Sequence, residues 1–132
     1  MHQGNVKLLE KVAKGAKSKG AEVIEFNLNN SGVRGCQATS IAVPMTVCTI
    51  NDYLQPMYKA INEADAIVFG SPIYYYQITG KARVWLDRTF SMLGDNFTPR
   101  HPGKKLITIF VQGSPDPKIG AESVKFANDI LE

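Results

Sequence analysis

The sequence predicts a doubly wound α/β domain, in which helices cover both faces of a parallel sheet. Two runs of apolar residues, 66–69 and 106–111, are unbroken, as is typical of strands buried on both faces. Amphipathic segments with helical spacing alternate with these runs, so crossover helices would join parallel strands. Both runs lead into the same tripeptide, Gly-Ser-Pro. A single domain over residues 1–132 is expected, because a chain of this length can build one core.

The first part of the chain is predicted to hold one helix and one short strand. Apolar residues recur at helical spacing from Asn5 onward, and Gly15 and Gly20 bracket the end of this segment. Residues 22–27 alternate apolar and polar side chains, which favours a short strand near a sheet edge. Residues 28–49 carry glycine, serine and proline without a sustained period, which indicates a long irregular excursion.

A second helix and the first buried strand are predicted next. Asp52 is placed to cap this helix, which would end near Asp65. Its inward face would consist of apolar residues at helical spacing, namely Leu54, Met57, Tyr58 and Ile61. The strand at residues 66–69 then stops at Gly70, where the Gly-Ser-Pro turn begins.

The last part of the chain predicts a third helix, a second buried strand and a final helix. Thr79 can cap the third helix. Its inward face would be formed by Ala82, Trp85, Leu86 and Leu93. Residues 95–103 are polar and predict a loop before the strand at 106–111. The final helix is expected from about Ala121 to the end of the chain.

Composition argues against several classes of protein. The net charge of +3 comes largely from lysines interleaved with the apolar positions of the first helix, which indicates a solvated helix face: Lys7, Lys11, Lys14, Lys17 and Lys19. Because these lysines have no aromatic neighbours, a nucleic-acid partner is not expected. Apolar runs stay well below the roughly 18 residues of a membrane span, so we expect no membrane partner and a cytoplasmic location. Cys36 and Cys48 are expected to be reduced thiols.

Ligand chemistry is expected where the two buried strands end, because doubly wound sheets bind ligands outside the carboxyl ends of their strands. The loop at residues 71–80 places three tyrosines beside a hydroxyl, an amide and backbone N–H groups, which suits a flat conjugated ligand. A subunit interface or a core rim explains the tyrosines equally well. Residues 112–117 would lie beside this loop if the two strands are neighbours, and an ordinary strand-to-helix turn is the alternative.

A block around the first buried strand is specific enough to compare with known families. Residues 64–74 read ADAIVFGSPIY, and ITG at 78–80 and WLDRT at 85–89 continue the pattern. Gly4-Asn5, residues 19–23 and residues 103–105 give weaker support. This set resembles the NADPH-dependent FMN reductases and their iron–sulfur flavoprotein relatives. The resemblance implies a flavodoxin-like doubly wound parallel sheet.

The resemblance also implies an FMN-dependent NAD(P)H oxidoreductase, in which the flavin passes electrons from a nicotinamide to an unknown acceptor. The cofactor-binding residues would be Ser71, Pro72, Ile73, Tyr74, Tyr75 and Tyr76 around the flavin ring, Gly113 and Ser114 at its other edge, and Gly4 and Asn5 near its phosphate. No side chain need act as a catalytic acid or base. Asp87 and Arg88 match a family pair, and an ion pair that orients the third helix is expected.

The cysteines depart from the pattern of iron–sulfur flavoproteins. Cys36 and Cys48 match the first and last positions of the family's cysteine motif, whereas Thr39 and Ala42 stand at the middle two. A [4Fe–4S] cluster normally needs four thiolates, so we expect no iron–sulfur cluster. Neither histidine has ligand spacing with a cysteine, and no metal site is predicted.

The two ends of the chain depart from the family as well. The domain is expected to lack the first strand with its phosphate loop, and the last strand and helix, while Val6 stands where a hydroxyl residue is expected. FMN would then be weakly bound or absent. The strand at 22–27 would pair with 66–69 directly or be exchanged between chains, and a homodimer or higher homo-oligomer is expected. The alternatives are a non-catalytic flavodoxin-like interaction or remnant protein, and a one-electron carrier, which the basic charge disfavours.

Overall fold

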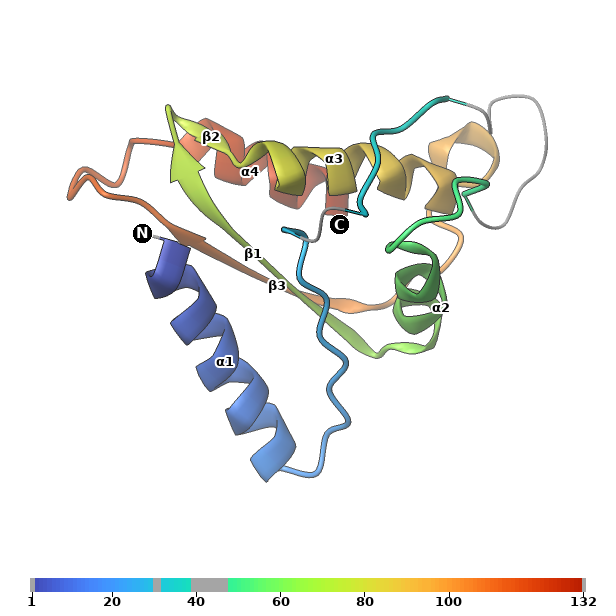
Figure 1. Ribbon diagram of the computed structural model, residues 1–132, viewed down its shortest axis with the longest axis horizontal. Helices are drawn as coiled ribbons and strands as arrows, with labels where there is room; N and C mark the ends of the chain where they lie inside the picture. Colours follow the sequence, from blue (N-terminus) through green and yellow to red (C-terminus); the bar gives the residue numbers. More distant parts are fainter. Residues whose placement is uncertain (1, 30–31, 39–47, 132) are drawn as a thin grey trace. The chain divides into compact units, whose positions relative to one another are not determined.

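The computed structural model of the chain describes residues 2–29, 32–38 and 48–131 (Figure 1). The chain forms two compact units. The first unit comprises Met1–Glu25, Ala66–Thr79 and Leu106–Glu132, and the second comprises Phe26–Asp65 and Gly80–Lys105. The fold is α/β, as the sequence predicts, and the described residues form four α-helices and a mixed sheet.

The sheet of the first unit contains three strands, β1 (Ala66–Tyr74), β2 (Gln77–Ile78) and β3 (Lys105–Val111). Their order is β2-β1-β3, and β1 and β3 run parallel. Strand β2 pairs antiparallel with the end of β1, where Ile73 lies opposite Ile78 and Tyr74 opposite Gln77. Both predicted strands are therefore confirmed, but their complete burial is not, because no residue of β3 is buried and Val68 of β1 is 40% exposed. Strand β1 also continues through the Gly-Ser-Pro segment instead of stopping at it.

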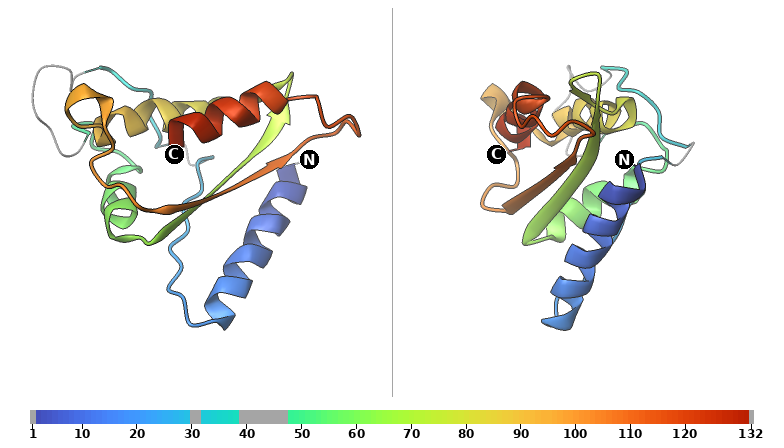
Figure 2. Two further views of the ribbon diagram at one scale, coloured as in Figure 1. Left: turned by 180° about the vertical axis from the view of Figure 1, so that it is seen from behind. Right: turned by 90° about the vertical axis from the view of Figure 1, so that its left-hand side faces the viewer.

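Helices α1 (His2–Ser18) and α4 (Ala121–Leu131) lie on opposite sides of these strands (Figure 2). Successive side chains of a strand point to opposite faces. On one face, a Cβ atom at Gly70 would lie 2.8 Å from Leu9 Cδ1 of α1. On the other face, Ile73 packs closely against Gly120, the residue just before α4. A Cβ atom at Gly120 would lie 2.8 Å from Ile73 Cγ2. The predicted coverage of both faces by helices is thus present in this unit.

Residues 21–27, all described by the structure, form no strand, so this prediction is wrong. A strand needs a neighbour that takes up its backbone groups. Among the described residues, the strands that pair with β1 are β2 and β3, and residues 22–27 do not join the sheet. Instead, the Asn27 N–H donates to the Tyr53 hydroxyl at 3.1 Å. Direct pairing of this segment with residues 66–69 is therefore excluded within the chain.

The second unit contains α2 (Gln55–Glu63), α3 (Gly80–Thr89) and two short 3₁₀ helices, Phe90–Met92 and Asp95–Phe97. The predicted inward residues that are buried here are Leu54, Met57, Tyr58, Ala82, Trp85 and Leu86. The Trp85 indole N–H donates to Met57 Sδ at 2.9 Å. Leu93 was expected on α3 but lies beyond its end, because α3 stops at Thr89.

Two predicted helix starts are also corrected. Helix α1 begins at His2 rather than Asn5. Asp52 does not cap α2, which begins at Gln55 after Leu54 with a proline in its first turn. The Asp52 carboxylate accepts a hydrogen bond from the Leu54 N–H at 3.0 Å, and its other partners lie outside the helix. A cap side chain accepts hydrogen bonds from the first N–H groups of its helix, whereas the Asp52 carboxylate accepts mainly from Arg34 and Arg88.

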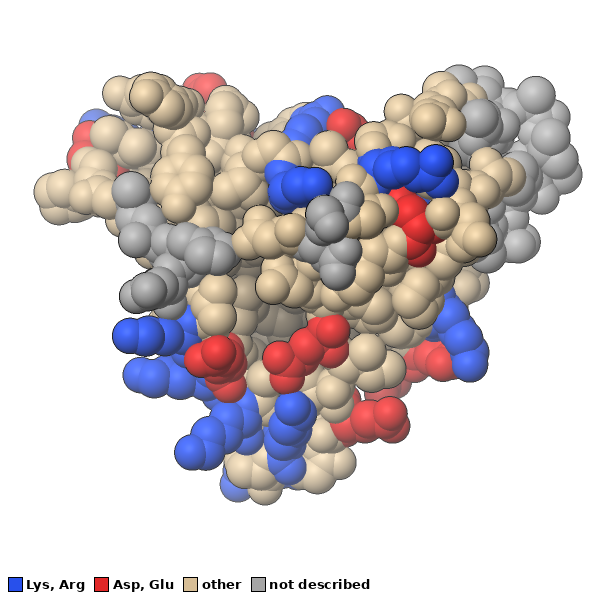
Figure 3. Space-filling view, viewed as in Figure 1, with Lys and Arg blue, Asp and Glu red and all other residues tan. Residues whose placement is uncertain are grey.

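Basic side chains gather over α1 (Figure 3). The five lysines singled out in the sequence are all exposed, and Lys17 pairs with Glu25 at 3.0 Å. This arrangement agrees with the predicted solvated helix face. Among the helices that the structure describes, none combines the length and apolar character needed to span a membrane.

Candidate functional site

The turn that joins β1 to β2, residues 74–77, is the main candidate site and is called the tyrosine turn below. Its two central residues, Tyr75 and Tyr76, have φ angles of 48° and 66°. A two-residue hairpin turn with positive φ at both central positions favours Asn and Gly. Left-handed backbone costs other residues roughly 1–2 kcal/mol each. The two residues are 96% and 63% exposed, so the fold holds two tyrosines in a costly conformation without burying them.

The residues just before the turn are buried beneath it. Ser71 is 1% exposed, and its hydroxyl accepts a hydrogen bond from the Thr79 N–H at 3.1 Å and donates to the Pro72 carbonyl at 2.9 Å. Pro72 and Ile73 are buried as well. Of the six residues predicted around the ring, Tyr74, Tyr75 and Tyr76 are therefore exposed, whereas the other three support them from below.

The segment between β3 and α4 contains the second predicted loop, residues 112–117, and it contacts the first loop through the residues that follow, at the start of α4. The Ser123 hydroxyl, in the first turn of α4, donates to Gln77 Oε1 at 2.7 Å, and Gly120 packs against Ile73. Within the loop, the Gln112 amide donates to the carbonyls of Ser114 and Asp116, at 3.2 and 2.6 Å. Strands β1 and β3 are adjacent, which is the condition on which the predicted neighbourhood of residues 71–80 and 112–117 depended.

The start of α1 reaches the same end of the sheet. A Cβ on Gly4 would lie 3.7 Å from Val111 Cγ1 at the end of β3. Asn5 is 4% exposed, and with its amide oriented to suit both neighbours it donates to the Ile109 carbonyl at 3.3 Å and accepts from the Ser71 N–H at 3.2 Å. The Asn5 side chain thus ties α1 to β1 and β3.

All ten predicted cofactor-binding residues lie in the first unit, near the carboxyl ends of β1 and β3. Two supporting residues were not predicted from the sequence, Gly120 and Ser123, whereas Gln77 was expected only as the amide of the first loop. A glycine directly before a helix is a detectable signal for Gly120. The hydrogen bond between Ser123 and Gln77 joins residues far apart in the chain, and no local pattern predicts it.

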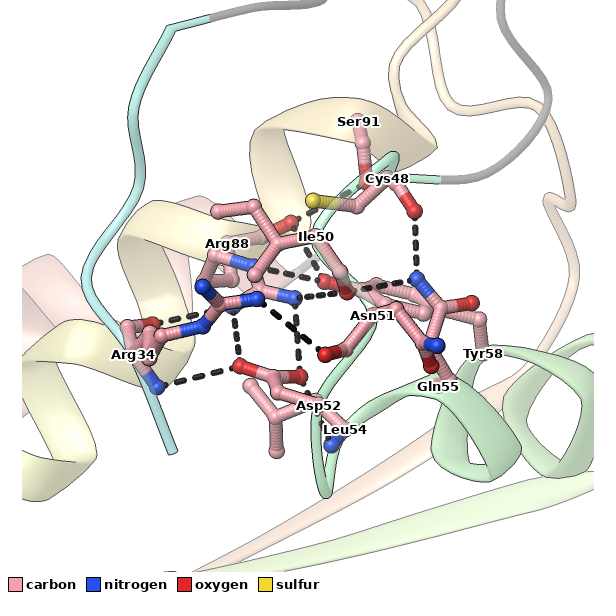
Figure 4. Close-up of polar contacts among 10 residues, drawn as sticks. All are labelled: Arg34, Cys48, Ile50, Asn51, Asp52, Leu54, Gln55, Tyr58, Arg88 and Ser91. Atoms are coloured by element: carbon pink, nitrogen blue, oxygen red, sulfur yellow. Dashed lines mark hydrogen bonds and ion pairs between the residues drawn. The ribbon is translucent and has the colours of Figure 1, made fainter. Parts of the chain in front are cut away.

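The second unit contains a buried polar network centred on Arg88 (Figure 4). Arg88 is 1% exposed and pairs with both carboxylate oxygens of Asp52, at 2.7 and 3.2 Å. Its guanidinium also donates to the Arg34 carbonyl at 2.9 Å, the Ile50 carbonyl at 3.4 Å and the Tyr58 hydroxyl at 3.1 Å. These bonds connect the segments around residue 34 and residues 50–52, which lie near the two ends of the irregular region, to Arg88 of α3.

The expected ion pair between Asp87 and Arg88 is wrong. Asp87 pairs with Arg83 at 3.0 Å on the exposed side of α3. Residues adjacent in a helix point in different directions, so Asp87 and Arg88 cannot share one face. Arg88 still orients α3, but its acidic partner is Asp52.

The network shifts the pKa values of its members. Burial by itself would raise the pKa of Asp52, but hydrogen bonds from Arg88 and from the backbone N–H groups of Arg34 and Leu54 lower it below its ordinary value. Burial raises the pKa of Tyr58 to about 12. Asp52 and Arg88 are therefore charged and Tyr58 is neutral near pH 7, which suits a structural role.

The described residues do not form an iron–sulfur or metal site. They contain no group of three or more His, Cys, Asp or Glu side chains placed to hold a metal ion. Cys36 is an exposed free thiol and Cys48 a buried one. Thr39 and Ala42 lie outside the described residues. Two thiols do not supply the four ligands of a [4Fe–4S] cluster, so the residues do not fit that group.

Comparisons with known proteins identify similar sequences. The family model for NADPH-dependent FMN reductase matches residues 2–126. An iron–sulfur flavoprotein of Archaeoglobus fulgidus is 24% identical over 98 residues, which cover 74% of this chain and 43% of the relative. Iron–sulfur flavoproteins of Methanocaldococcus jannaschii and Methanosarcina thermophila are 27% and 26% identical, over 61% and 62% of this chain and 41% and 43% of the relatives. The matches therefore cover less than half of each relative's length, and no solved structure matches.

Proposed function

The chain belongs to the NADPH-dependent FMN reductase family, and on that premise we propose that it acts as an FMN-dependent NAD(P)H oxidoreductase. The observation that carries the proposal is the tyrosine turn, which presents exposed rings in a strained conformation at the carboxyl end of β1. Its electron acceptor is of unknown chemistry. Aromatic faces beside backbone donors are what a flat, conjugated cofactor requires.

The residues around the turn fit a flavin ring. Tyr75 and Tyr76 have ring faces free of the core, and Gly113 is exposed in the adjoining loop. These residues, with Tyr74 and Ser114, would hold the ring, while Ser71, Pro72 and Ile73 would support it from below. When bound, FMN would supply the transfer of electrons from the nicotinamide to the acceptor. The chain's own residues would bind the ring and fix its orientation.

The phosphate of FMN is expected to be held weakly. The Asn5 side chain is already bonded to β1 and β3, and Val6 has no hydroxyl to offer. Charge-assisted hydrogen bonds contribute about 1.5–3 kcal/mol each, so a site without them loses most of its preference for a phosphate. The N–H groups at the start of α1, near Gly4, remain as partial compensation.

A fluorescence titration of the apo-protein with FMN and riboflavin tests this proposal. We expect both to bind, with less than about a tenfold preference for FMN. Tyr75→Ala should weaken binding of both. Phe97→Ala is a matched control, because Phe97 is also aromatic, 72% exposed and at positive φ but belongs to the second unit. Absence of any flavin binding would contradict the proposed function, and submicromolar FMN binding with a large preference over riboflavin would contradict the weak phosphate site.

The alternative function is a non-catalytic flavodoxin-like interaction protein. The engaged side chain of Asn5 favours it, since a chain that cannot hold the phosphate need not carry a cofactor. A visible spectrum after FMN addition and an assay of NADH and NADPH oxidation distinguish the two. Bound flavin with nicotinamide oxidation supports the reductase, and the lack of both supports the alternative.

A homodimer or higher homo-oligomer is also proposed. On the face of the sheet that carries α1, Val68 and Ile107 remain 40% and 49% exposed, and Leu8 of α1 is 45% exposed. Exposed apolar side chains on a sheet face favour association with a second copy. Sedimentation at micromolar concentration tests this, and a monodisperse monomer would refute it.

A further inference from the structure

The tyrosine turn is held from both sides by one other segment of the chain. Ile73, just before the turn, packs against Gly120, whose φ of 77° and lack of a side chain allow the close approach. Gln77, at the end of the turn, accepts the hydrogen bond from Ser123 at 2.7 Å. Gly120 and Ser123 both belong to the entry into α4. The strained pair Tyr75-Tyr76 is thus fixed between two contacts with the same element.

This arrangement exceeds what a simple connection requires. Strands β1 and β2 are already joined at their base by the Ser71 hydroxyl, which accepts from the Thr79 N–H. A turn whose only role is to connect two strands would carry Asn-Gly, which adopts positive φ at little cost. Here tyrosines occupy both positions, and a buried serine, 4% exposed, is used to hold the residue that follows them.

We propose that Ser123 and Gly120 are positioning residues, which hold the tyrosine turn in its ligand-binding conformation from the start of α4. Neither residue touches the ligand in this proposal. The inference rests on the proposed function, because the ligand of the turn is taken to be the flavin ring. Its physical basis is preorganisation: a turn that is already ordered loses less conformational freedom when a ring binds.

Ser123→Ala tests the proposal, with Ser123→Thr as the conservative variant and Lys125→Ala as the control on an exposed position of α4. Two measurements are made on each: amide hydrogen exchange of residues 73–78, and riboflavin affinity. Ser123→Ala should speed exchange in the hairpin and weaken riboflavin binding about three- to tenfold. Ser123→Thr should keep both the hairpin exchange rate and the riboflavin affinity near their wild-type values, and Lys125→Ala should change neither.

Two further variants keep the test independent of folding defects. Gln77→Ala removes the same hydrogen bond from its exposed end and should reproduce the Ser123→Ala result. The double variant Tyr75→Asn, Tyr76→Gly should slow exchange in the hairpin, because its backbone strain is relieved, yet weaken riboflavin binding at least tenfold.

The outcomes separate this inference from the proposed function. If the wild-type chain binds no flavin, the proposed function fails, and faster hairpin exchange in Ser123→Ala still supports a positioning role for the turn. If Ser123→Ala and Gln77→Ala leave hairpin exchange unchanged, or speed it while riboflavin affinity stays at the wild-type value, the positioning role is overturned.

Discussion

The tyrosine turn of the first unit and the Arg88 network of the second unit use their side chains in opposite ways. The turn exposes two large rings at positive φ, whereas the network buries a guanidinium and a carboxylate and gives each several partners. Buried charges are tolerated only when they are paired and hydrogen-bonded, so we assign the network a structural role. The turn costs folding free energy and contributes little packing, and ligand binding is the role proposed for it.

The largest loss in the free energy of unfolding is expected from Arg88→Met. The substitution leaves the Asp52 carboxylate buried without its cation, which destabilises proteins by about 3–5 kcal/mol. Urea unfolding measures the loss. Arg83→Met is the matched control on α3, because its pair with Asp87 is half exposed and contributes less than about 1 kcal/mol. Equal effects of the two substitutions would show that the network does not hold the second unit together.

A smaller loss in the free energy of unfolding is expected from Ser71→Ala at the base of the tyrosine turn. The variant removes the part-buried hydrogen bond between the Ser71 hydroxyl and the Thr79 N–H, and a bond of this kind contributes about 0.5–1.5 kcal/mol. Chemical denaturation gives the value, and Ser71→Cys keeps a side chain of similar size as a comparison. A loss below about 0.5 kcal/mol would mean that the hairpin is closed by its strand pairing alone.

The pH dependence of stability should distinguish the two regions further. The folded pKa of Asp52 is lowered, so its stabilising contribution is present above the unfolded pKa of about 4 and is lost as pH falls through the folded value. Between about pH 4 and pH 2 the free energy of unfolding should therefore fall more in the wild type than in Asp52→Asn. Unfolding by urea at several pH values measures this. Asp87→Asn, at an exposed pair, should follow the wild type, and a flat wild-type profile would contradict the assignment.

We expect that reconstitution with iron and sulfide forms no iron–sulfur cluster on the protein. Cys48 is buried in the second unit and Cys36 is exposed, so the chain contains two thiols where a cluster needs four. Analysis of iron and acid-labile sulfide after reconstitution should find far less than one cluster per chain. Stoichiometric iron and sulfide would refute this prediction and would require ligands from a second copy.

Several features follow from local patterns and were predicted from the sequence. The unbroken apolar runs correspond to β1 and β3, and the segments with helical spacing correspond to α1, α2, α3 and α4. The parallel arrangement of β1 and β3 is also confirmed, and the two strands are neighbours, because the order of helices and strands restricts how strands can be arranged. The candidate residues of the tyrosine turn could be identified for the same reason.

Other features depended on partners that are distant in the sequence, and only the tertiary structure decided them. Residues 22–27 have an alternating pattern, but in the part of the chain that the structure describes they pair with no strand, so the pattern alone does not produce a strand. Arg88 takes Asp52 instead of its neighbour Asp87, because helix geometry separates adjacent side chains and packing brings residue 52 to α3. The same holds for Ser123 and Gln77. Ion pairs, strand pairing and strained turns all require a second segment in a definite place, and that placement is a property of the whole fold.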